Sequence, residues 1–268
     1  MTRKRCAFCD RVATLTKEHL WPKSLHKRLE DVGSGNRNYF WLKRLKQEIQ
    51  SEPQVRDVCG DCNNGVLSEL DSYICDLFDA QLVHMPQRQE TITFSFDYHL
   101  LKRWLLKLSF NSARIHGSPD RQALEALRAY ILGKDILLGR STQLFLQLVY
   151  PERVPESDLQ AEYRGKEKII WEPDSHRTGH MFFRAHEIGQ KLLRAVHLRS
   201  FSFFVAYWEP TTGRAEQNFF ETVYCAQEKF ARLLRPSKQS IQVVCEGMGA
   251  WESWQESRST EFRFNKDV

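Results

Sequence analysis

Cys6-Ala7-Phe8-Cys9 and Val58-Cys59-Gly60-Asp61-Cys62-Asn63 are the two stretches that decide the fold of the N-terminal part of this chain. Each holds a Cys-x-x-Cys pair, and two such pairs supply the four thiolates of a closed tetrahedral zinc site. The region around them is poor in apolar residues, so a bound metal would stabilise it where a hydrophobic core cannot. The spacing therefore predicts a structural Zn2+ ion held by Cys6, Cys9, Cys59 and Cys62.

A disulfide framework or a redox-active pair is the alternative for these cysteines. The chain has 7 cysteines, an odd number, and it begins Met1-Thr2-Arg3-Lys4-Arg5 with no apolar run before Cys6. We therefore expect no export signal and a reducing, cytoplasmic location, where Cys-x-x-Cys pairs bind metal more often than they form disulfides. Zinc is the favoured interpretation, and the redox and disulfide alternatives stay open.

An acid-histidine pair, Glu18-His19, lies between the two cysteine pairs, and Asn63 directly follows the last cysteine. A zinc ion that joins the two pairs would bring the chain after Cys9 close to the chain after Cys62, so His19 and Asn63 are expected to be neighbours. An imidazole can take a proton from water, and a carboxylate with an amide oxygen can hold a hard cation such as Mg2+. Together these groups would form a one-metal site that hydrolyses phosphodiesters.

A simpler interpretation of the same residues is structural. Glu18 and His19 would then be surface residues before a turn at Pro22, and Asn63 would cap the following helix. Taken singly, each residue favours this interpretation, whereas their position between two zinc-binding pairs favours a site.

The order Cys-x-x-Cys, Glu-His-x-x-Pro and Cys-x-x-Cys-Asn, over roughly the first 80 residues, resembles the zinc-containing subset of the HNH endonucleases, which have the ββα-metal fold. The resemblance implies that His19 is the general base and that Glu18 and Asn63 bind a catalytic Mg2+ or another divalent cation. It implies a nuclease whose substrate is nucleic acid, with DNA expected. It also implies a role in bacterial phage defence or in mobile elements.

Two positions depart from the family pattern. The asparagine that orients the base in the family has its nearest counterpart in Gln54, whose amide oxygen could take that role. The final histidine of the family is Asn63 in this chain, which is a weaker metal ligand. The alternative function is therefore a catalytically degenerate, zinc-containing module that binds nucleic acid or protein without cutting.

Residues 1–46 carry many more cations than acids. A basic face beside a hydrolytic site suits a polyphosphate, because each neutralised phosphate releases counterions and holds the strand without reading its sequence. A solubilising surface is the alternative. The cations are Arg3, Lys4, Arg5, Arg11, Lys17, Lys23, Lys27, Arg28, Arg37, Lys43, Arg44 and Lys46.

A chain of 268 residues can bury a substantial core, and we expect two domains in an α+β fold. Residues 1–86 would form the HNH-like zinc module, and residues 87–268 a helix-plus-antiparallel-sheet domain that positions substrate or senses a partner or ligand. Apolar spacing predicts helices at 67–78, 100–113 and 123–132, and strands at 91–96, 143–150, 201–208, 219–224 and 240–245.

Several features are expected to be unremarkable. No run of about 18 apolar residues occurs, so no membrane span is predicted. Asp71 is expected on a helix surface. His176 and His180 are expected in a solvated loop rather than a second metal site, because Gly179 lies between them and the glutamate of a zinc-protease helix is absent. The sequence does not decide whether the chain binds a protein partner or forms a homo-oligomer.

Overall fold

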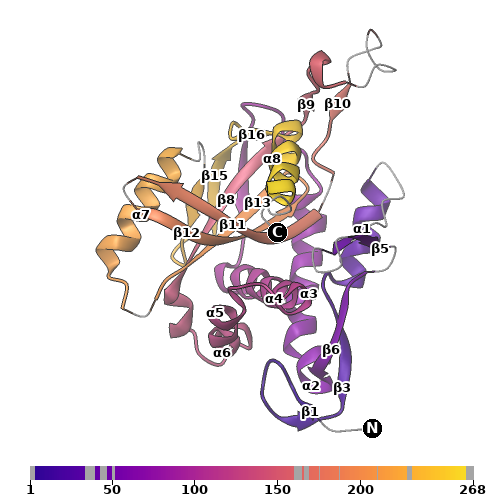
Figure 1. The fold of residues 1–268 in the computed structure, drawn as a ribbon, viewed down its shortest axis with the longest axis vertical. Coiled ribbons are helices and arrows are strands. Elements are labelled where there is room, and N and C mark those ends of the chain that lie inside the picture. The colour runs from indigo at the N-terminus through magenta and orange to yellow at the C-terminus, as the bar shows by residue number, and fades with distance from the viewer. Residues whose placement is uncertain are drawn as a thin grey trace.

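The computed structural model describes residues 4–33, 40–42, 47–49, 52–159, 165, 169–174, 176–186, 188–209, 211–227 and 231–263. They form an α+β fold in which helices pack on an antiparallel sheet, which confirms the predicted class (Figure 1). In chain order the elements are β1 (Lys4–Arg5), β2 (Val12–Ala13), β3 (Leu15–His19), α1 (Lys23–Val32), β4 (Phe40–Leu42), β5 (Gln47–Ile49), β6 (Gln54–Cys59), α2 (Gly60–Asn64), α3 (Val66–Leu77), a π-helix (Phe78–Leu82), β7 (Thr91–Ser95), α4 (Tyr98–His116), α5 (Arg121–Ala126), α6 (Arg128–Ile131), a 3-10 helix (Leu137–Ser141), β8 (Thr142–Tyr150), β9 (Glu152–Arg153), a 3-10 helix (Glu156–Asp158), β10 (Ile170–Trp171), β11 (His176–Ala185), β12 (Gly189–Leu198), β13 (Phe201–Tyr207), α7 (Arg214–Gln227), β14 (Arg232–Leu234), β15 (Ser240–Val244), β16 (Met248–Gly249) and α8 (Ala250–Arg263).

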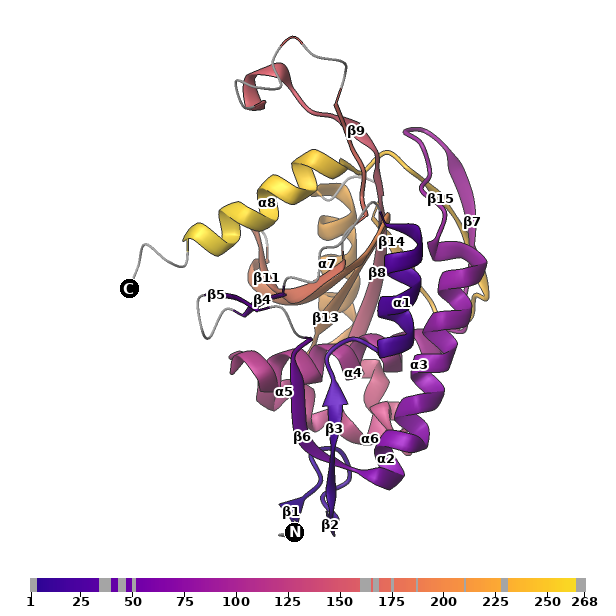
Figure 2. The same cartoon turned by 90° about the vertical axis from the view of Figure 1, so that its right-hand side faces the viewer.

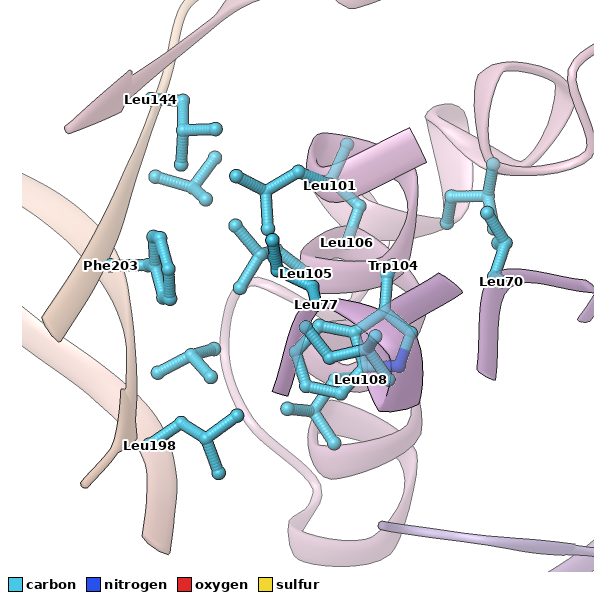
Figure 3. Packing of buried hydrophobic residues seen from close by; sticks show 14 of the residues in the cluster. Leu70, Leu77, Leu101, Trp104, Leu105, Leu106, Leu108, Leu144, Leu198 and Phe203 are labelled. Atoms are coloured by element: carbon cyan, nitrogen blue, oxygen red, sulfur yellow. The ribbon is translucent and has the colours of Figure 1, made fainter. Parts of the chain in front are cut away.

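The long helix α4 lies at the centre of the molecule (Figure 2). It begins where the Asp97 carboxylate accepts a hydrogen bond from the Leu100 backbone N–H at 2.9 Å, and it ends at Gly117, whose φ of 65° few other residues tolerate. Its side chains pack on α3 on one side and on the large sheet on the other (Figure 3). The residues labelled in this packing are Leu70, Leu77, Leu101, Trp104, Leu105, Leu106, Leu108, Leu144, Leu198 and Phe203.

The large sheet has the strand order β11-β12-β13-β8-β14, all antiparallel, and β16 pairs with β8 in parallel. Both of its faces are covered. Leu144, Leu146 and Leu148 of β8 belong to the core that includes α4, whereas Phe145 contacts Tyr224 of α7 at 4.7 Å between ring centroids. Strands buried on both faces need apolar residues pointing to both sides, which explains the largely apolar sequences of β8 and β13, interrupted by polar residues such as Gln147 and Ser202.

The predicted strand at 219–224 is wrong, because these residues lie in α7. Phe220 and Tyr224, one helical turn apart, are both buried against the sheet, whereas Phe219 is 46% exposed. The run is rich in aromatic and β-branched residues, which favour strands, but its packing surface recurs with the helical period.

The predicted loop around His176 and His180 is also wrong, because both residues belong to β11, which pairs with β12 along its whole length. His176 contacts Trp21 and His26 through its ring, at centroid distances of 5.0 and 5.1 Å. The sheet therefore reaches the segment that follows β3.

One hydrophobic core runs through both segments of the predicted two-domain division. The same cluster contains Phe8, Trp21 and Leu70 from the first segment and Trp104 and Phe203 from the second. The predicted boundary at residue 86 therefore does not coincide with a gap in the core. Among the helices of the described residues, none has the length and apolar character that crossing a bilayer requires.

Lys102 of α4 gives a test of this core. Its ammonium is buried and donates to the carbonyl oxygens of Gly139 and Thr142, at 2.6 and 2.9 Å, and to the hydroxyl of Tyr98. Burial lowers the pKa of Lys102 to about 7. Between that pH and the ordinary lysine pKa, the unfolded chain binds one more proton than the folded chain, so the free energy of unfolding rises with pH.

We expect this rise to reach about 1.4 kcal/mol per pH unit above pH 7. Urea unfolding of the parent and of Lys102→Met at pH 7, 8 and 9 measures it, because the methionine removes the titrating group. If the free energy of unfolding had the same pH dependence in the two proteins, the lowered pKa of Lys102 would be contradicted.

Candidate metal centre and hydrolytic site

The four cysteines of the two Cys-x-x-Cys pairs converge on one point. All four Sγ atoms lie within 4.8 Å of one another, and the Cys9 and Cys59 Sγ atoms are 3.7 Å apart. A tetrahedral zinc ion with Zn–S bonds of about 2.3 Å requires sulfur atoms about 3.8 Å apart. The cluster therefore has the ligands and the spacing to bind a metal such as zinc, as predicted.

Local backbone geometry shapes the cluster. The β1–β2 hairpin turns at Asp10, whose φ of 59° is tolerated by aspartate better than by most residues, and the Cys6 N–H donates to the Arg11 carbonyl oxygen at 2.9 Å. The Ala7 N–H donates to the carbonyl oxygen of Asp57 at 2.8 Å, which joins the first pair to β6. The Cys59 N–H donates to Cys6 Sγ at 3.3 Å. Backbone hydrogen bonds of this kind hold the sulfurs in place.

The thiols of the cluster differ in acidity. Burial opposes ionisation of Cys9, but hydrogen bonds from Arg11 outweigh it and lower the pKa of Cys9 to about 6. Burial raises the pKa of Cys59 and of Cys62. A metal ion binds thiolates, so it would supply the positive charge that the buried pair lacks.

His19 lies at the end of β3, directly opposite Gln54 of β6. Its Nδ1 atom is 2.5 Å from Glu52 Oε2, and the other oxygen of Glu52 accepts a hydrogen bond from the Trp21 N–H at 2.9 Å. The His19 side chain is 35% exposed, and no described residue forms a hydrogen bond with its Nε2 atom. A carboxylate on Nδ1 with an open Nε2 is the arrangement of a general base.

Glu52 is the site residue that the sequence interpretation missed. The Gln54 Nε2 atom is also near His19 Nδ1, but at 3.4 Å it is farther away than the Glu52 carboxylate. Glu52 lies two residues before Gln54, just ahead of the first residue of β6. An acid at this spacing was the available signal.

Glu18 points the opposite way, because consecutive strand residues face opposite sides. It is 3% exposed, and its Oε1 atom accepts hydrogen bonds from Lys107 at 2.9 Å and from Asn111 at 3.1 Å. Both partners come from α4, so the carboxylate lies where the antiparallel pair of strands β3 and β6, called the β3–β6 hairpin below, meets the central helix.

Lys107 also binds Asp71 of α3, with its Nζ atom 2.7 and 2.6 Å from the two carboxylate oxygens. The expected surface placement of Asp71 is wrong, because this ion pair and a hydrogen bond from the Trp104 Nε1–H draw its carboxylate inward. Burial disfavours the charge on Lys107, but Asp71 and Glu18 raise its pKa above the ordinary value.

Asn63 lies on α2 and contacts β3. Its amide Nδ2 donates to Thr16 Oγ1 and to the Lys17 carbonyl oxygen, both at 2.9 Å. A carbonyl oxygen only accepts, so this contact fixes which end of the amide is the nitrogen. Both amide protons are used, and Oδ1 is the atom left to bind a ligand.

Carboxylate and amide oxygens such as those of Glu18 and Asn63 are ligands that Mg2+ or a similar ion prefers, but Glu18 contacts α4 whereas Asn63 contacts Thr16 and Lys17. Apart from the cysteines, the described residues contain no cluster of three or more His, Cys, Asp or Glu ligand atoms. Such an ion would therefore depend on the Asn63 amide and on water or substrate oxygens for its remaining ligands. Because Glu18 is also buried and ion-paired with Lys107, the described residues do not form a ready site for a second metal ion.

Two exposed cations lie on the same strands as His19 and Gln54, Lys17 of β3 and Arg56 of β6, at the point where the register of the pair shifts. Neither forms an ion pair with a described residue, whereas Arg11 and Arg28 are paired with Asp61 and Asp79. Lys23 and Lys27 of α1 are also exposed. Arg3, Arg37, Lys43, Arg44 and Lys46 lie outside the described residues.

Comparison of the chain with protein-family models, with curated proteins and with solved structures found no match.

The cysteine cluster predicts the outcome of single substitutions. Cys62→Ser should lower the zinc content from one ion per chain towards zero and destabilise the protein, because a structural zinc site contributes directly to folding. Cys225→Ser is the matched control, because Cys225 lies outside the cluster. Zinc content by mass spectrometry and thermal unfolding with and without chelator measure both effects. A parent protein that contains no zinc after purification, or whose unfolding temperature does not change with chelator, would refute the assignment of the four cysteines to a structural zinc site.

Proposed function

We propose that this protein is a metal-dependent endonuclease of the HNH type that hydrolyses phosphodiester bonds in nucleic acid, with DNA the expected substrate. The observation that supports the proposal most is the short contact between His19 Nδ1 and Glu52, with Nε2 left open, on a hairpin that carries the cysteine cluster. The mildly basic chain, with a net charge of +5, is compatible with a polyanionic substrate.

In this mechanism His19 takes a proton from water through Nε2 while the water oxygen forms a bond to phosphorus and the bond to the leaving oxygen breaks. Glu52 holds the imidazole in one orientation and stabilises the imidazolium that forms. The sequence resemblance assigns Glu18 and Asn63 to a divalent cation, and such an ion would supply positive charge for the scissile phosphate. Lys17 and Arg56 flank His19 and would hold neighbouring phosphates.

The wider role rests on the motif resemblance alone. It suggests bacterial phage defence or mobile-element activity, with residues 87–268 positioning substrate or recruiting a protein partner.

A second candidate function is a zinc-containing module that binds nucleic acid or protein without cutting. The observation that favours it is the buried ion pair of Glu18 with Lys107, because this ammonium already neutralises the carboxylate expected to bind the metal. This function predicts salt-sensitive binding of nucleic acid and no divalent-dependent cleavage.

The first prediction from this function concerns His19→Ala. Loss of a general base should slow cleavage by about 10²- to 10⁴-fold while zinc content and fold are kept. Plasmid nicking or linearisation by purified protein, with Mg2+, Mn2+ or Ni2+ and with EDTA, measures the effect.

His84→Ala is the matched control, because His84 also pairs with a carboxylate, Glu90, at 2.7 Å but lies outside the hairpin. It should cut like the parent. Cleavage by His19→Ala at the parent rate would rule out the mechanism. A folded, zinc-loaded parent that fails to cut with any of the ions tested would favour the binding module.

The second prediction separates Glu52 from Gln54. Glu52→Gln should lower the cleavage rate at least about 10-fold, because a neutral amide stabilises the imidazolium less than a carboxylate does. Gln54→Ala should have the smaller effect, since its amide is the more distant partner of His19. The single-turnover rates of the two variants provide the comparison. A larger loss in Gln54→Ala would return the orienting role to Gln54.

A further inference from the structure

A row of polar side chains crosses the large sheet on the face that α8 covers (Figure 1). Residues directly opposite one another on neighbouring strands point to the same face of a sheet. The register of the sheet gives this row as Arg177 of β11, His197 of β12, Ser202 of β13 and Gln147 of β8. Arg177 Nη2 donates to Oγ of Ser253 at 2.6 Å and to its carbonyl oxygen at 3.1 Å, which joins the row to α8.

A hollow lies between this row and α8. Its closed part has room for about one water-sized group, and the hollow measures about 290 Å3 when its open mouth is counted. Only a few atoms of a ligand can therefore enter it, and the rest of the ligand would lie at the mouth. The side chains that matter for recognition are Arg177, His197, Arg199, Ser202, Trp171 and Trp254, all of which line the hollow.

Arg199 is the most unusual of these residues. It is the first of the two residues that connect β12 to β13, and its φ is 53°. Two-residue hairpin loops with a left-handed first residue usually have glycine there, because a side chain is strained in this conformation. The chain therefore keeps an arginine where the backbone favours glycine.

The guanidinium of Arg199 is also costly to bury. The residue is 4% exposed, and its Nη1 atom donates to the Val32 carbonyl oxygen at 3.3 Å, whereas its Nε atom has no hydrogen-bond partner within the described part of the chain. Burial lowers the pKa of Arg199, although Asp174 and Glu172 oppose this effect. A strained backbone and an unsatisfied buried donor both disfavour folding, and such features concentrate at functional sites.

The donors around the hollow suit an oxyanion. A guanidinium only donates hydrogen bonds, and the hollow has two, from Arg177 and Arg199. Among the described lining residues the one carboxylate is Glu172, which is exposed. Burial keeps the pKa of His197 well below its ordinary value, so this side chain is neutral at pH 7. A phosphate monoester, with a charge of about −1.5 to −2 near pH 7, matches two guanidiniums better than a carboxylate does.

We propose that this hollow binds the phosphate group of an aromatic phosphate monoester, such as a nucleoside monophosphate, with Arg199 as a principal donor. The base of the nucleotide would lie at the mouth against Trp171 or Trp254, because indole rings stack on bases. The nucleotide is either free or the phosphorylated end of a nucleic-acid strand. None of these residues belongs to the hydrolytic site, so the inference does not rest on the proposed function.

Calorimetric titration of the full-length, zinc-loaded protein with adenosine monophosphate tests the site. Adenosine and inorganic phosphate should each bind at least about 10-fold more weakly than the nucleotide, because each lacks one half of the recognised group. Arg199→Gly should raise the Kd of the nucleotide at least about 10-fold. Without ligand, its unfolding temperature should equal or exceed that of the parent, because glycine relieves the strain and removes the buried guanidinium. Arg199→Asn should act in the same direction, because asparagine tolerates the left-handed conformation.

Arg184→Ala is the matched control, because Arg184 lies at the far end of β11, is exposed and donates to Gln190 instead of lining the hollow. It should leave the Kd of the nucleotide unchanged. A short single strand with a terminal phosphate distinguishes the two sources of the ligand. Tighter binding of this strand than of adenosine monophosphate assigns the site to strand ends, and weaker binding assigns it to free nucleotides.

Three results would overturn the proposal. The first is a parent that does not bind adenosine monophosphate, or that binds adenosine or inorganic phosphate equally well. The second is an unchanged Kd in both Arg199 variants. The third is a lower unfolding temperature in both variants, which would assign Arg199 to the fold through its contact with Val32. Cleavage is not measured here, so a failure of this site leaves the proposed nuclease function to its own tests.

Discussion

The ammonium of Lys107, buried between the carboxylates of Glu18 and Asp71, is the contact on which the arrangement of this protein depends. It joins three elements that are far apart in the chain, the strand β3, the helix α3 and the helix α4. Removing one partner from a buried ion pair typically costs about 3–5 kcal/mol, because the charge left behind has no water to solvate it. The hairpin and the central helix are therefore held together by charge as well as by apolar packing.

The same contact bears on the role that the sequence predicts for Glu18. Its carboxylate is buried and contacts Lys107 and Asn111 of α4, although the sequence resemblance assigns it to a metal ion. His19, on the other side of the strand, is free of this constraint and has its own carboxylate in Glu52. His19 and Glu18 are thus adjacent in sequence but face opposite sides of the strand, and each contacts a different part of the chain.

Sequence patterns predicted the α+β class and the cysteine cluster because both depend on local spacing. The spacing of a Cys-x-x-Cys pair lets both of its sulfur atoms bind one metal ion, and the apolar residues of α4 recur with the helical period. The inward placement of Asp71 and the contacts of Asn111 were not predictable in this way, because each depends on a partner distant in the chain. For Glu52 the only signal was an acid two residues before Gln54, and its contact with His19 also joins distant residues. The wrong strand prediction at 219–224 also results from distant contacts. The aromatic residues of α7 that are buried are those that pack on the sheet, which lies far away in the sequence.

The continuous core that joins the first 86 residues to the rest has a consequence for how such a chain can evolve. A self-contained module can be moved between genes by recombination at its boundary, and it keeps its fold in the new context. Here a crossover at residue 86 would separate Glu18 from Lys107 and Phe8 from Phe110. The N-terminal segment and α4 must therefore be inherited together, and substitutions in one are tolerated only when they suit the other.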